Sequence, residues 1–127
     1  MLNAKCLAVI LLTLMAGCEE GGMLSKSSQY ARLEAIPQEK WDALAKEKIF
    51  FGHQSVGENI VDGIKEVMRA HPGIRLDIRE TSRPEDFERP VFAHWPIGEN
   101  KNPKSKIDHF REIMESGVGQ RATIAFF

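Results

Sequence analysis

The fold is decided by residues 48–59, KIFFGHQSVGEN, in which an apolar run stops at Gly52 and a serine stands where a helix begins. The run Ile49–Phe51 predicts a short strand, and helical spacing of apolar residues begins at Val56. Ligands of open α/β sheets bind in the crevice outside the carboxyl ends of parallel strands. The hydroxyl of Ser55 is therefore the first candidate for a functional group.

Apolar periodicity alternates between helical and extended spacing along the rest of the chain. Pro37 and Asn102-Pro103 are favourable helix starts, and Pro72-Gly73 is a favourable stop. Within the proline-containing segment 81–103, residues 91–93 are the one stretch that could form a strand. We expect helices at residues 37–45, 56–71 and 103–116, and strands at residues 49–51, 74–78 and 122–127.

This order of elements predicts a parallel sheet flanked by helices, because a crossover between parallel strands needs about the length that these helices provide. The expected fold class is a partial three-layer α/β/α domain covering residues 30–127. The last apolar run, residues 122–127, is followed by no turn, cap or polar tail. We therefore expect the sequence to be the amino-terminal part of a longer domain, truncated at its carboxyl end.

Composition sets further bounds on the function. The chain has 127 residues, 43% of them hydrophobic and 28% charged, which suits one small globular domain. The formal net charge is −1. Nucleic-acid binding usually requires a clustered basic face, so no nucleic-acid partner is expected.

Residues 1–17 have the pattern of a secretory signal peptide. Lys5 is their one charged residue, residues 7–15 are almost wholly apolar, and Ala16-Gly17 supply small residues before a cut. Residues 14–18, LMAGC, resemble the lipobox of bacterial lipoproteins, which implies cleavage before Cys18 and acylation of its thiol. The alternative is an ordinary thiol that follows a plain secretory signal.

The lipoprotein interpretation also sets the expected location. Residues 18–29 are small and polar without periodicity, as in a flexible tether. Several acyl chains together anchor a protein stably, since each buried methylene contributes roughly 0.8 kcal/mol. We expect a lipid-anchored protein of the bacterial cell envelope that faces the periplasm or the cell exterior, with the membrane as partner through acylated Cys18.

Residues 50–60, FFGHQSVGENI, together with residues 97–100, IGEN, and Asn102-Pro103, resemble a divergent branch of the SGNH/GDSL hydrolases. The resemblance covers about the first half of such a flavodoxin-like fold. It implies hydrolysis of small acyl or acetyl esters, such as those of surface glycans. In that family a serine after the first strand is the nucleophile, and a glycine and an asparagine help form the oxyanion hole. By this resemblance the catalytic residues are Ser55, Gly98 and Asn100.

Two features of the sequence support a non-catalytic alternative. Residues 55–58, SVGE, fit the capping box S-x-x-E, in which the serine and the glutamate only satisfy a helix terminus. The Asp-x-x-His that supplies the family's base occurs nowhere in the chain. The alternative function is therefore a catalytically inactive lipoprotein, binding module or remnant, and we expect these 127 residues alone to be inactive.

The candidate bases are the histidines, each of which also has a structural interpretation. His53 either acts on Ser55 or shapes the pocket rim, and His71 and His109 suit a helix end and a solvated helix face. His94-Trp95-Pro96 is expected on a loop, where Trp95 either stacks on a ligand or packs on the body. These histidines are His53, His71, His94 and His109.

The sequence contains no motif for a cofactor. No two histidines have the i, i+4 spacing of a helical metal site, and the carboxylates follow no ligand pattern, so no metal is predicted. Neither a G-x-G-x-x-G motif nor a P-loop lysine pattern accompanies Gly52 and Gly57. Phosphate and dinucleotide cofactors are therefore not expected.

Overall fold

The computed structural model describes residues 32–127. Three predictions lie outside the described residues, namely the signal peptide 1–17, the acylation of Cys18 and the tether 18–29. Among residues 32–127, no helix combines the length and the apolar character that crossing a membrane requires.

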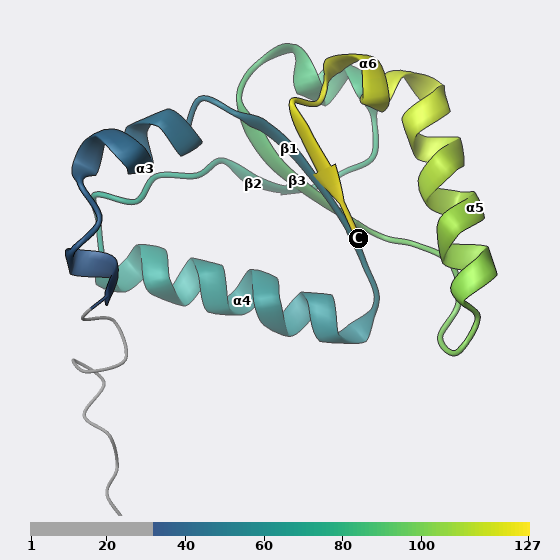
Figure 1. Cartoon of the computed structure of the whole chain (residues 1–127), viewed down its shortest axis with the longest axis horizontal. Coiled ribbons are helices and arrows are strands. Elements are labelled where there is room, and N and C mark those ends of the chain that lie inside the picture. The colour runs from purple at the N-terminus through teal and green to yellow at the C-terminus, as the bar shows by residue number, and fades with distance from the viewer. Residues whose placement is uncertain (1–31) are drawn as a thin grey trace, which may run out of the picture. The chain divides into compact units, whose positions relative to one another are not determined.

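Four parallel strands form a single sheet in the order β2-β3-β1-β4 (Figure 1). The strands are β1 (Lys48–His53), β2 (Ile78–Glu80), β3 (Val91–Pro96) and β4 (Ile124–Phe126). β1 pairs with β3 on one side and with β4 on the other, and β2 pairs with β3, always in parallel. The predicted parallel α/β fold is confirmed.

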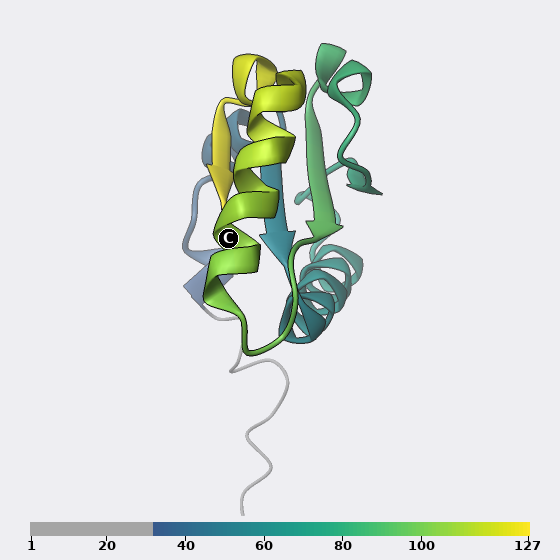
Figure 2. The ribbon, with the colours of Figure 1, turned by 90° about the vertical axis from the view of Figure 1, so that its right-hand side faces the viewer.

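Helices cover both faces of the sheet. The helices are α3 (Gln38–Leu44), α4 (Ser55–Ala70), α5 (Pro103–Ile113) and α6 (Gly119–Arg121), with a 3-10 turn η1 (Pro84–Glu88) and a π-turn η2 (Met114–Val118). In Figure 2, α5 runs across the face of the sheet that is turned to the viewer. Residues of α4 and α5 pack into different core clusters, so the two long helices lie on opposite faces.

The two cores follow from the alternation of side chains along the strands. In β1, Phe50 faces α5, whereas Ile49 and Phe51 face α4. The cluster on the α5 side consists of Phe50, Phe87, Val91, Ala93, Ile97, Ile113 and Val118. The cluster on the α4 side consists of Ile49, Phe51, Val61 and Phe92.

Local signals placed most helix ends correctly. Asn102 caps α5, with its side-chain oxygen accepting a hydrogen bond from the Ser105 N–H at 3.1 Å, and Pro103 is the first helical residue. After α5, Gly117 has a φ of 119° and interrupts the helical backbone inside η2, close to the helix end that the sequence predicted at Ser116-Gly117. At the first helix, however, Pro37 is the N-cap and not the first helical residue.

Two strand predictions need correction. The predicted strand 74–78 begins only at Ile78, since the Ile74 N–H donates to the His71 carbonyl in a turn and pairing with β3 starts at Ile78. Segment 81–103, expected to be a loop in which residues 91–93 could form a strand, contains the whole of β3, which is paired throughout with β1. Both differences arise because the ladder, and not the local apolar pattern, sets the strand ends.

Candidate functional site at the carboxyl edge of the sheet

The carboxyl ends of β1 and β3 lie at a topological switch point. The chain leaves β1 through α4 on one face of the sheet and leaves β3 through α5 on the other. Adjacent strands whose connections diverge in this way border the crevice in which open α/β sheets bind ligands. The Ile97 N–H donates to the His53 carbonyl at 2.8 Å, so the two strand ends are held side by side.

Gln54 ties the two loops of this crevice together. It is the N-cap of α4, and its side-chain Nε2 donates to the carbonyls of Ile97 at 2.7 Å and Gly98 at 2.6 Å. Gly98 has a φ of 56°, and an added Cβ would lie 2.5 Å from the backbone nitrogen of Lys106. The sequence interpretation assigned no role to Gln54.

Ser55 is the first residue of α4 and is exposed. No side chain caps this helix, so the predicted capping box is wrong. The reason is that Gln54, with extended φ and ψ, occupies the N-cap position, which places Ser55 one residue too far along to cap. The Ser55 hydroxyl is therefore not used to stabilise the helix end.

A hollow of about 270 Å³ opens beside Ser55. Apolar side chains from β1, α4 and the chain terminus form much of its wall, and the polar lining residues are His53, Gln54, Ser55, Asn100 and Lys106. The structure thus brings Ser55 and Asn100 to one hollow. Gly98 lies in the adjoining loop, where its N–H donates to His109 Nδ1 at 3.1 Å. The apolar lining residues are Phe51, Val56, Ile60, Ile97 and Phe127.

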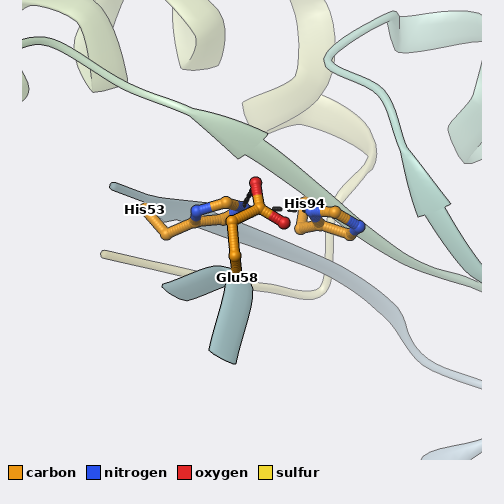
Figure 3. Close-up of side chains that lie close together, drawn as sticks. All are labelled: His53, Glu58 and His94. Carbon is orange, nitrogen blue, oxygen red and sulfur yellow. Dashed lines mark hydrogen bonds and ion pairs between the residues drawn. The ribbon is translucent and has the colours of Figure 1, made fainter. Parts of the chain in front are cut away.

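A second polar cluster lies at the same edge of the sheet. His53 and His94 are buried at the ends of β1 and β3, with His53 Nε2 3.0 Å from His94 Nδ1. Glu58, from the first turn of α4, places Oε1 3.9 Å from His53 Nε2 (Figure 3). Ligand atoms of these three side chains all lie within 4.8 Å of one another.

Gly57 allows α4 to approach this cluster closely. An added Cβ at Gly57 would lie 2.1 Å from the Cβ of His53. The pKa of His94 is lowered, chiefly because burial disfavours the charged imidazole and then because of the charge of His53. Glu58 and Glu80 oppose this shift, and Lys65 adds to it. His94 is therefore held toward its neutral form.

The other histidine predictions have mixed outcomes. His71 is the C-cap of α4, as expected for a helix end. His109 is half-buried and bonded to Gly98, so its prediction as a solvated residue is wrong. His94-Trp95-Pro96 belongs to β3 and not to a loop. Trp95 packs against the core on the α5 side, as in the packing alternative.

The histidine pair was missed because its members are 41 residues apart and meet only through strand pairing. A usable signal was present, since each histidine follows an apolar run that forms a parallel strand. Adjacent parallel strands bring their carboxyl ends to one edge of the sheet. Helical i, i+4 spacing, the pattern sought in the sequence, cannot detect such a pair.

Comparisons with protein-family models, curated proteins and solved structures found no match.

Proposed function

We propose that the hollow at the carboxyl ends of β1 and β3 is the substrate site of a serine ester hydrolase of the SGNH/GDSL type, with Ser55 as nucleophile. The observation that carries the proposal is the Ser55 hydroxyl, which is exposed in a hollow at the switch point and takes no part in helix capping. A serine without a structural task at such a place is a candidate for chemistry.

The surroundings of Ser55 suit a small ester. The largely apolar wall can receive an acyl or acetyl group, and the polar side chains of Asn100 and Lys106 can orient the ester oxygens. The first N–H groups of a helix have no intrahelical acceptor, and Ser55 and Val56 carry two of them at the hollow. These N–H groups are candidate donors to a developing oxyanion.

A second candidate, a catalytically silent ester-binding module, is favoured by the histidine geometry. Within residues 32–127, His53 and His94 are hydrogen-bonded to each other, and His109 is bonded to Gly98. His71 lies at the far end of α4 from Ser55. Serine without a base is a weak nucleophile, so acylation of these 127 residues is expected to be slow.

The proposal can be tested even when acylation is slow, by comparing how far two exposed serines are modified. On prolonged incubation with p-nitrophenyl acetate or a fluorophosphonate, we expect peptide mass spectrometry to find Ser55 modified in preference to Ser116. Ser116 is the control because it is also exposed but lies in η2, outside the hollow. Equal modification of both serines would contradict the proposal. Rapid stoichiometric labelling of Ser55 would instead identify a histidine as an efficient base.

The Ser55→Ala variant separates chemistry from structure. We expect it to abolish labelling in the hollow while changing the free energy of unfolding by less than about 0.5 kcal/mol, since the side chain is exposed and does not cap. Loss of an N-cap would cost ~1 kcal/mol. Urea unfolding followed by circular dichroism distinguishes the two values.

We also propose that the protein acts at the bacterial cell envelope, anchored through Cys18. This proposal rests on the lipobox-like residues 14–18 and on the polar tether. The intact mass of protein isolated from its native membrane should correspond to a chain that begins at Cys18 and carries the added mass of acyl groups. A mass that retains Met1, or lacks acyl groups, would refute the anchor.

A further inference from the structure

We propose that His53, His94 and Glu58 form a binding site for one divalent transition-metal ion of the zinc class, with a fourth coordination position left open. The site adjoins the hollow beside Ser55 and shares one residue with it, because His53 lines that hollow whereas His94 and Glu58 do not. Metal binding there does not depend on Ser55 acting as a nucleophile. Two imidazole nitrogens with one carboxylate are a donor set that zinc accepts readily, whereas magnesium prefers oxygen ligands alone.

The spacing of the donor atoms is close to what a tetrahedral ion requires. Zinc–nitrogen bonds of about 2.0–2.1 Å at tetrahedral angles separate two nitrogens by roughly 3.3 Å. His53 Nε2 and His94 Nδ1 are 3.0 Å apart, so their separation must grow by a few tenths of an ångström while the rings turn to aim both lone pairs at the ion. Glu58 Oε1 is 3.9 Å from His53 Nε2, and its half-exposed side chain is free to move inward.

A neighbouring hydrogen bond prepares His53 as a ligand. Its Nδ1 lies 3.2 Å from the Gln54 carbonyl, which can only accept, so Nδ1 carries the proton. In the neutral imidazole Nε2 then has a free lone pair, and this nitrogen lies beside His94 Nδ1 and the Glu58 carboxylate (Figure 3). A histidine held by a backbone carbonyl in this way is the usual outer-shell arrangement of metal sites.

His94 completes the pair with a change of tautomer. In the metal-free state its Nδ1 donates to His53 Nε2, since that nitrogen is the acceptor of the pair. Metal binding requires Nδ1 to be unprotonated, so the proton of neutral His94 moves to Nε2. Glu80, paired in register with His94 on β2, lies on the same face of the sheet. Burial, which keeps His94 neutral, favours its use as a ligand.

The cluster is positioned by rigid elements. Both histidines extend from paired strands, and the contact of Gly57 with His53 holds the first turn of α4, and with it Glu58, beside them. His53 and His94 are both buried, and their facing nitrogens share a single hydrogen bond. A metal ion would satisfy both nitrogens and the carboxylate together.

Equilibrium dialysis of the full chain against Zn²⁺, after removal of metal with a chelator, tests the site. We expect one zinc per wild-type chain. Glu58→Gln should weaken binding at least about tenfold, because the ligand is lost while an exposed side chain is exchanged for one of equal size. Asp62→Asn is the matched control, one turn further along α4 and also exposed, and should leave zinc affinity unchanged. Co²⁺ should give the visible absorption bands of a four-coordinate site, reduced in Glu58→Gln.

A second variant tests whether the bound zinc is held by the histidine cluster or by the cysteines of the full chain. His94→Gln should abolish the stoichiometric binding and the Co²⁺ bands. If His94→Gln does not fold, as judged by circular dichroism, the comparison of Glu58→Gln with Asp62→Asn decides alone. Absence of zinc binding at micromolar concentrations would overturn the proposal. So would binding that Glu58→Gln leaves unchanged, because the ion would then reside elsewhere.

Discussion

Replacing Gly57 with alanine is expected to lower the free energy of unfolding by about 1–3 kcal/mol, the usual cost of overpacking a filled site. The added Cβ would lie 2.1 Å from the Cβ and 2.3 Å from the Cγ of His53, distances at which one group must move. His53 is buried in β1 and paired with His94, so α4 must shift away from the sheet. The change should also separate Glu58 from the histidine pair.

Gly63→Ala is the matched control for this prediction. Gly63 lies in the same helix, and nothing is within 4 Å of the position that its Cβ would take. Alanine is favoured over glycine inside a helix, so this variant should gain roughly 0.5–1 kcal/mol. Urea unfolding monitored by circular dichroism gives both values. Equal effects of the two substitutions would show that the approach of α4 to His53 is not tight.

Phe50→Ala is expected to have the largest effect on stability, a loss of about 3–5 kcal/mol. Phe50 is fully buried in the central strand and is part of the core cluster on the α5 side. Its ring centroid lies 6.4 Å from that of Phe87 and 6.0 Å from that of Phe110. Truncation would leave a cavity between the sheet and the elements that cover this face.

Phe126→Ala makes the same chemical change on the edge strand β4. The Phe126 side chain stacks on Phe51 at 5.0 Å, but the residue is 44% exposed. A smaller loss, roughly 1–2 kcal/mol, is therefore expected, because less apolar area leaves water on folding. Thermal or urea unfolding of both variants measures the difference. A loss at Phe126 as large as that at Phe50 would show that the Phe126 ring is as closely packed as the fully buried ring of Phe50.

The sequence by itself determined the fold class and most element positions. The apolar run of residues 49–51, the helical spacing that begins at Val56, and the cap Asn102 with Pro103 are signals between near neighbours in the chain. Such signals act within one or two turns or strand residues, so they can be interpreted without knowledge of the tertiary structure. Alternation of helices and strands then indicated parallel pairing, which the structure confirms.

The tertiary structure decided how the start of α4 is built. The pattern SVGE at residues 55–58 favoured a serine cap, yet Gln54 takes that position and bonds to the carbonyls of Ile97 and Gly98. Those carbonyls are more than 40 residues away in the chain. No local rule includes them, and so the local pattern indicated the wrong residue.

The composition of the candidate site was likewise decided by strand order. Ser55 and Asn100 meet at one hollow, and His53 meets His94, because β3 pairs beside β1 while β2 is displaced to the edge. Residue types and spacing determine which strands form, but the choice of neighbours depends on burial summed over both faces of the sheet. This burial is a property of the whole domain. The strand order that it favours brings the side-chain nitrogens of two histidines, distant in the chain, within 3.0 Å of each other.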